Sequence, residues 1–144
     1  MDACALIYRF EGNAALRDAT TGLIAELTAN QPKVALAVSR LSVLECRVKP
    51  LREGDSTLLQ RYAAFFAAVQ VIELDAHVVD IATDLRARQG LKTPDALQAA
   101  CALRWQSMGE KVVFLTADNG FAKVPELGLR LIDTAPLPSA KIPP

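Results

Sequence analysis

Short apolar runs rich in β-branched residues alternate along this chain with longer segments of helical periodicity. Residues 34–38, 69–74 and 111–116 have the length and composition of buried strands, and 129–132 form a weaker fourth. Over 58–69 and 78–85, apolar residues recur every three or four positions, as on the buried face of a helix, and further helices are expected over 15–29 and 94–103. Strands that alternate with helices predict an α/β domain with a mostly parallel sheet.

The chain has 144 residues, a length typical of one domain. We place that domain at residues 1–133, because no repeat or low-complexity block interrupts them. Residues 134–144 are rich in proline and are expected to form an irregular tail. Within the domain, Pro94 suits a first helical position, with Thr93 as the expected cap.

Composition excludes several classes of function. Lysine and arginine together number 16, as do aspartate and glutamate, so the chain does not bind nucleic acid by bulk positive charge alone. No apolar run reaches the roughly 18–20 residues of a membrane span. Three widely spaced cysteines indicate neither a disulfide framework nor a zinc site and suit a reducing cytoplasm. The only histidine, His77, is expected on the surface in the first turn of a helix, so a catalytic triad is excluded.

The usual glycine-rich phosphate-binding and nucleophile motifs are absent, which leaves acidic residues as the chemical groups to consider. Asp2 begins an apolar segment, and Glu45 lies in another that follows the strand expected at 34–38. Asp95 lies at the start of a helix, and Asp118 follows the strand expected at 111–116. Polar groups beyond the carboxyl ends of parallel strands meet at one edge of the sheet.

Each acid also has a purely structural interpretation. Glu45 would complete a capping box that starts at Ser42. Asp95 would interact with the helix dipole, Asp118 would stabilise a turn, and Asp2 would be a solvated terminus. Taken together, however, clustered carboxylates repel one another unless a cation lies between them. An all-oxygen ligand set suits Mg²⁺ or Mn²⁺, which promote hydrolysis of phosphodiesters.

Four acidic motifs in this order resemble those of PIN-domain ribonucleases, in the branch of small VapC-like toxins. They are Asp2-Ala-Cys-Ala-Leu-Ile-Tyr8, Ser39-Arg-Leu-Ser-Val-Leu-Glu45, Thr93-Pro-Asp-Ala-Leu-Gln-Ala-Ala100 and Leu115-Thr-Ala-Asp-Asn-Gly-Phe121. The resemblance extends from Asp2 to about Asp133. It implies a three-layer α/β/α domain with a mostly parallel sheet of four or five strands.

The resemblance also implies a metal-dependent endoribonuclease that uses Mg²⁺ or Mn²⁺. Asp2 and Asp95 match the leading metal ligands of the family, and Glu45 and Asp118 complete its acidic quartet, with one acid accepting the proton of the attacking water. Thr116, Ser39 and Ser42 either orient these carboxylates or serve only as structural caps.

The same resemblance implies a cognate antitoxin that binds across the active-site groove and holds the enzyme inactive. It also implies that the chain forms a homodimer. The aromatic helix over 58–69 either lines a groove for a partner or packs only on its own core. Basic residues near two of the acids are candidates for guiding RNA: Arg40, Arg47, Lys49, Arg52, Arg86, Arg88 and Lys92. The alternative for each is an ordinary solvated surface charge.

One feature departs from the family pattern. Relatives carry an apolar strand directly before the first aspartate, whereas here only Met1 precedes Asp2. We therefore expect either a missing central strand or a natural start further upstream. Without that strand the ligand role of Asp2 is the least secure of the four.

Two other functions are compatible with an α/β domain of this kind. The first is a catalytically inactive PIN-like module that binds RNA or a partner. The second is a phosphatase of the haloacid-dehalogenase type, which ranks lower because that chemistry needs an aspartate two residues after the nucleophilic one, where Cys4 stands.

Overall fold

The computed structural model describes residues 1–134, so most of the predicted proline-rich tail lies outside the described residues. In chain order the elements are α1 (Ala3–Glu11), α2 (Ala14–Thr28), β1 (Ala37–Ser39), α3 (Arg40–Glu53), α4 (Ser56–Ala68), β2 (Gln70–Ile72), α5 (Ala76–Gln89), α6 (Thr93–Ser107), β3 (Phe114–Thr116), the 3₁₀ helix η1 (Asn119–Lys123) and β4 (Leu129–Leu131).

Side-chain caps define where most of the helices begin. Asn13, Asp55 and Asp75 each accept a hydrogen bond from the backbone N–H three residues later, at the starts of α2, α4 and α5. The predicted cap of α6 is wrong: Thr93 is already the first helical residue, and Lys92 precedes it without a side-chain cap. Pro94 does lie in the first turn, where its missing N–H costs no helical hydrogen bond.

The four strands form two separate two-stranded sheets, both parallel. β1 pairs with β2, with Val38 opposite Val71, and β3 pairs with β4, with Leu115 opposite Arg130. The strands are shorter than predicted: residues 34–36 and 111–113 precede β1 and β3 without entering a ladder. The sheet is therefore parallel, as expected, but divided in the middle.

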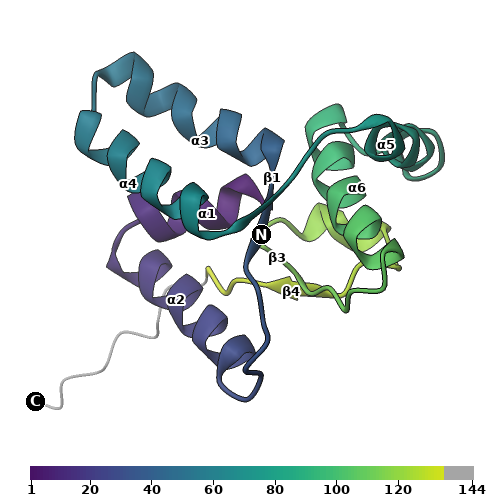
Figure 1. The fold of residues 1–144 in the computed structure, drawn as a ribbon, viewed down its shortest axis with the longest axis horizontal. Coiled ribbons are helices and arrows are strands. Elements are labelled where there is room, and N and C mark those ends of the chain that lie inside the picture. Colours follow the sequence, from purple (N-terminus) through teal and green to yellow (C-terminus); the bar gives the residue numbers. More distant parts are fainter. Residues whose placement is uncertain (135–144) are drawn as a thin grey trace, which may run out of the picture.

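The amino terminus lies between the two pairs of strands (Figure 1). The Met1 amino group donates a hydrogen bond to Ala37 O of β1 at 2.9 Å, and Asp2 N donates to Leu115 O of β3 at 3.2 Å. Two residues thus connect the strand edges that face each other across the division.

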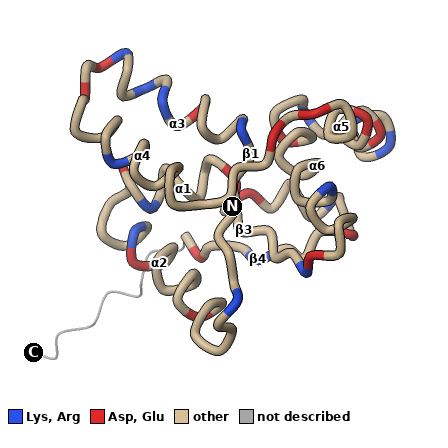
Figure 2. The backbone as a smooth tube through the Cα atoms, in the orientation of Figure 1, with Lys and Arg blue, Asp and Glu red and all other residues tan. Residues whose placement is uncertain are grey.

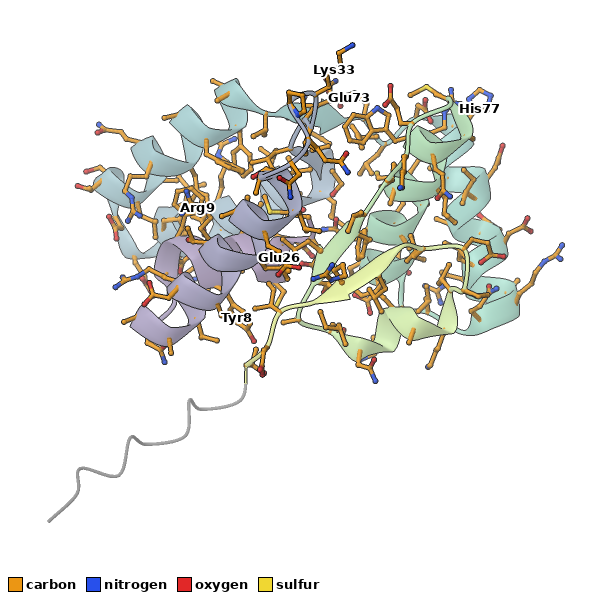
Figure 3. The ribbon with its side chains drawn as sticks, turned by 90° about the horizontal axis from the view of Figure 1, so that it is seen from below. Tyr8, Arg9, Glu26, Lys33, Glu73 and His77 are labelled. Atoms are coloured by element: carbon orange, nitrogen blue, oxygen red, sulfur yellow. The ribbon has the colours of Figure 1, made fainter. Side chains whose placement is uncertain are left out.

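Helices cover both faces of β3, which gives the three layers. Phe114 is buried among residues of α5 and α6, whereas the next residue, Leu115, is buried beside Ala5 and the apolar side chains of α2. Successive strand residues point to opposite faces, so these helices lie on opposite sides of the strand. On the α2 side, Arg130 Nη2 of β4 donates to Glu26 Oε1 at 2.9 Å, and Figure 3 shows Glu26 on α2.

A further apolar cluster joins α1, β1, α3 and α4 around the buried side chains of Leu6, Val38, Cys46 and Tyr62. Figure 1 shows α1 to α4 on one side of the strands and α5 and α6 on the other. Among the helices of residues 1–134, none has the length and apolarity needed to cross a membrane.

Candidate active site

Asp2 is a buried residue held from two directions. Its side chain is the N-cap of α1: Oδ1 accepts from Ala5 N at 2.9 Å, and Oδ2 accepts from the Thr116 hydroxyl at 2.6 Å. Only 5% of the residue is exposed, so the solvated terminus considered above is wrong. Burial raises the pKa of Asp2, and the hydrogen bonds from Thr116 and Ala5 oppose that shift.

Glu45 lies in α3, less than two turns after β1 ends. The N-cap of α3 is Ser39, whose Oγ accepts from Ser42 N, so the capping box from Ser42 to Glu45 is wrong. Instead Glu45 Oε2 accepts a hydrogen bond from Gln98 Nε2 of α6 at 3.2 Å. Burial raises the pKa of Glu45, the Gln98 hydrogen bond opposes the rise, and the charges of Asp2 and Asp95 add to it.

Gln98 was not singled out from the sequence, yet it connects α6 to this part of the site. Its Oε1 accepts from the hydroxyls of Ser39 at 2.7 Å and Ser42 at 3.2 Å, while Nε2 also donates to Ser42 Oγ at 2.9 Å. All three residues are buried. The sequence feature that could have identified Gln98 is its amide side chain, which stands among the small apolar residues of α6.

Asp95 projects from the first turn of α6, as the sequence predicted. It is half-buried. Burial raises the pKa of Asp95, the charge of Asp118 raises it further, and Lys92 acts in the opposite direction. The helix dipole favours a carboxylate at this position, but burial and a second acid oppose its ionisation.

Asp118 is the N-cap of η1, two residues after β3 ends, and it is exposed. Its Oδ1 accepts from Gly120 N at 2.7 Å, the turn geometry that the sequence suggested. Its own backbone N–H donates to Thr116 Oγ1 at 3.0 Å. One buried hydroxyl, that of Thr116, therefore donates to the Asp2 carboxylate and accepts from the backbone of Asp118.

The fold brings the four predicted acids close enough together that the charges of some raise the pKa values of others. The charge of Asp118 raises the pKa of both Asp2 and Asp95, and the charges of Asp2 and Asp95 both raise the pKa of Glu45. The four residues come from segments that lie far apart in the sequence.

The spacing of the four acids is wider than one coordination shell. Within residues 1–134 no three acidic, histidine or cysteine side chains lie close enough to hold a metal ion together. The donor chemistry nevertheless fits a hard divalent cation, because every donor is a carboxylate oxygen and mutual repulsion would be relieved by a positive charge.

Most of the basic residues suggested as RNA guides have local partners. Arg40 pairs with Glu73, and Lys49 Nζ lies 3.1 Å from Glu11 Oε2. Arg88 lies 4.0 Å from Asp84, and Arg86 donates to the Thr93 hydroxyl. Lys92 is the basic residue whose charge acts on Asp95. Figure 2 shows basic residues along α3 and acidic residues along the segment leading into α5.

The single histidine lies on the surface, where the sequence suggested. His77 is exposed in the first turn of α5, at the edge of the molecule in Figure 3. The cysteines are free, and burial raises the pKa of both Cys46 and Cys101 to about 12, so these two are not poised as nucleophiles.

The aromatic helix α4 packs mainly on the core of the protein. Tyr62 is fully buried, and its ring lies 4.8 Å from that of Phe10 in α1 and 5.8 Å from that of Phe66. A groove of about 460 Å³ remains between α3 and α4, lined in part by Leu51, Leu59 and Phe66.

Comparison with known proteins is consistent with this geometry. The family model of the PIN domain matches residues 1–127. A toxin–antitoxin complex from Klebsiella pneumoniae has a similar chain, with a TM-score of 0.67 and 22% identity over 92% of this chain and 95% of that one. VapBC2 from Rickettsia felis, bound to a DNA fragment from its promoter, has a TM-score of 0.71 and 18% identity over 92% and 100%. No curated protein matches the chain.

Proposed function

The chain belongs to the PIN-domain family, and from this premise we propose that it is a metal-dependent endoribonuclease, the toxin of a VapC-type toxin–antitoxin pair. PIN domains are generally nucleases, and the site described above is built around four carboxylates. The observation that carries the proposal is the placement of the acids: one Thr116 hydroxyl contacts both the Asp2 carboxylate and the backbone of Asp118, Gln98 of α6 donates to Glu45, and Asp95 projects from the first turn of the same helix.

Asp2 and Asp95 would be the leading ligands of Mg²⁺ or Mn²⁺, and Glu45 and Asp118 would complete the site directly or through water. The bound cation would activate water and neutralise the charge of the scissile phosphate. The protein contributes positioning: Thr116 orients Asp2 and the backbone of Asp118, and Gln98 orients Glu45. A carboxylate with a raised pKa is suited to accept the proton of the attacking water.

The proposed substrate is RNA in single strands or loops, where the phosphates are free to adopt an in-line geometry. Lys92 is exposed beside Asp95 and would attract the phosphate backbone toward the carboxylates. The formal net charge of zero fits such local attraction better than a broad basic surface.

The proposed partners are a cognate antitoxin and a second copy of the chain. The groove between α3 and α4 and the exposed side chains of Leu44 and Leu51 support an apolar contact surface on this side of the molecule. Both structural neighbours named above are toxin–antitoxin proteins, although their low identity supports only the fold.

Incubation of the purified protein with RNA and Mg²⁺ or Mn²⁺ tests the proposal. We expect Asp95→Asn and Asp118→Asn to cleave at least about 100-fold more slowly than the unmodified chain, because each removes a charge needed for the cation. Asp80→Asn is the matched control, since this exposed aspartate lies on α5 outside the quartet. In cells, expression should arrest growth, and the cognate antitoxin should restore it.

Cleavage at the same rate by all four proteins would refute the active-site assignment. Binding of RNA without cleavage in the presence of either cation would instead support the alternative of a non-catalytic PIN-like module. Circular dichroism of each variant should remain native, which separates loss of activity from loss of fold.

A further inference from the structure

Arg40 and Glu73 face each other where strands β1 and β2 end. Arg40 is the first residue of α3, directly after β1, and Glu73 directly follows β2. The two strands are parallel, with Ser39 opposite Ile72, so the residues that follow them lie side by side at the carboxyl edge of this sheet. In Figure 2 the basic start of α3 lies next to the acidic segment that leads into α5. The ends of two neighbouring strands therefore bring a cation and an anion together.

The ion pair between these two residues is two-pronged but exposed. Arg40 Nε donates to Glu73 Oε2 at 3.0 Å and to Oε1 at 3.2 Å, and Nη2 also donates to Oε1. The Arg40 side chain is 50% exposed and that of Glu73 is 62% exposed. Exposed ion pairs contribute little to stability, because water solvates both partners when they separate. Another anion can therefore take the place of Glu73 at small cost.

The pair borders the candidate active site. Ser39, the residue before Arg40, donates to Gln98 Oε1 at 2.7 Å. The same amide donates through Nε2 to Glu45 Oε2 at 3.2 Å. In parallel α/β proteins, ligands bind beyond the carboxyl ends of the strands, which is where Arg40 lies. A strand of RNA bound across Glu45 would therefore place a phosphate within reach of the Arg40 guanidinium.

We propose that Arg40 binds an RNA phosphate next to the scissile one, and that Glu73 holds the same guanidinium in the free protein as a competing anion, an inference that rests on the proposed function. An arginine fork offers carboxylates and phosphates the same pair of parallel N–H donors, so RNA would exchange one ion pair for another. A strand contacts several basic groups and releases counterions at each of them, whereas a single phosphate ion does not. A strand would therefore displace Glu73 more readily than free phosphate.

Another ion pair of the same kind provides a comparison. Arg130 Nη2 lies 2.9 Å from Glu26 Oε1, and the two side chains are 44% and 65% exposed, close to the values for the first pair. Arg130 lies opposite Leu115 within the ladder of β3 and β4, and not beyond the end of a strand. The two pairs therefore differ in their position in the sheets and hardly in their exposure.

Binding of a short, fluorescein-labelled single-stranded RNA of mixed sequence tests the proposal. Fluorescence anisotropy gives the Kd at several salt concentrations, with Ca²⁺ in place of Mg²⁺ and with gels to confirm that the RNA stays intact. The variants are Arg40→Gln, Glu73→Gln and the combination of both. Glu26→Gln and Arg130→Gln are the matched controls, and thermal unfolding is measured for every chain.

We expect Glu73→Gln to lower the Kd at least about threefold and Arg40→Gln to raise it at least about fivefold. Arg40→Gln should also reduce the slope of log K against log salt by roughly 0.7, the contribution of one phosphate contact on a single strand. In the Arg40→Gln background, Glu73→Gln should change the Kd by less than about twofold, because Glu73 acts through Arg40. The Kd values of the two controls, and the Tm values of all variants, should stay near those of the unmodified chain.

An unchanged Kd for either single variant, or no binding of RNA by the unmodified chain, would overturn the proposal. An equal gain from Glu73→Gln with and without Arg40 would also overturn it, since the acid would then repel RNA in general and not compete for the guanidinium. Cleavage in Mg²⁺ or Mn²⁺ tests the nuclease function separately. RNA binding that depends on Arg40, without cleavage, would support the phosphate contact and refute the nuclease, whereas cleavage and binding unaffected by Arg40→Gln would do the reverse.

Discussion

Gln98 illustrates how a single side chain links the candidate site to the core. Its amide satisfies two buried serine hydroxyls and still donates to Glu45. An apolar residue of similar size would leave those hydroxyls without their partner, and burial makes an unsatisfied polar group costly. The same residue therefore affects both stability and the ionisation of Glu45.

Replacement of Gln98 by leucine should lower the free energy of unfolding by about 1–3 kcal/mol. It should also raise the pKa of Glu45 further, because the hydrogen bond that favours the carboxylate is lost. Urea unfolding and NMR titration of the Glu45 carboxyl group measure the two effects. Gln106→Leu on the exposed side of α6 is the control and should change neither. An unchanged pKa of Glu45 would contradict the positioning role.

The four acids could be selected from the sequence because their motifs combine a carboxylate with recognisable strand or helix signals. The groups that orient them were harder to identify. Gln98 contacts residues 56 and 59 positions away in the chain, and no local pattern encodes such contacts. Likewise, the serine that caps α3 is Ser39, not the start of a box at Ser42, because α3 begins at Arg40, directly after β1.

At the scale of elements, one largely buried acid joins three helices. Glu11, at the end of α1, accepts from the Tyr62 hydroxyl of α4 at 2.6 Å and from Lys49 Nζ of α3 at 3.1 Å. The Glu11 side chain is only 10% exposed, whereas that of Lys49 is 60% exposed. The hydrogen bond from Tyr62 to Glu11 should therefore contribute more to stability than the ion pair between Lys49 and Glu11.

Tyr62→Phe should lower the free energy of unfolding by about 1.5–3 kcal/mol, because it removes a hydrogen bond to a charged acceptor without changing the ring packing. Lys49→Gln should have a smaller effect, since solvent screens its exposed ammonium group. Urea unfolding compares the two variants. A larger loss for Lys49→Gln than for Tyr62→Phe would contradict this ranking.

Helical patterns in the sequence predicted α2, α4, α5 and α6 but gave no bounds for α1 or α3, and strand composition overestimated the strands. Residues 34–36 and 111–113 have the apolar character of strands and still remain outside any ladder. Composition indicates that a segment is suited to a buried strand, whereas pairing also requires a neighbour on the open edge. At these two segments the neighbouring position is the division between the two sheets.

At the scale of the whole molecule, the candidate site lies where two groups of elements meet. Asp2 and Glu45 come from α1 and α3, whose apolar side chains share a cluster with α4, while Asp95 and the η1 cap Asp118 come from elements packed with α5. Repulsion between these carboxylates therefore acts across the interior of the molecule. A cation between them would convert that repulsion into attraction on both sides.

A divalent cation should consequently stabilise the entire fold, by about 2.7 kcal/mol at a hundred times its dissociation constant. The pKa values of Asp2, Glu45 and Asp95 are raised in the folded state, so without the cation the ionisation of these acids opposes folding. This penalty is relieved as the pH falls through the raised pKa values and the carboxylates take up protons. In that acidic range protons compete with the cation for the carboxylates. The stabilisation by the cation should therefore be greatest near neutral pH and should disappear on acidification. Thermal unfolding with and without Mn²⁺, from about pH 7.5 to about pH 4.5, measures this change. A Tm shift that persists at the acidic end, or in a variant combining Asp95→Asn with Asp118→Asn, would place the cation elsewhere.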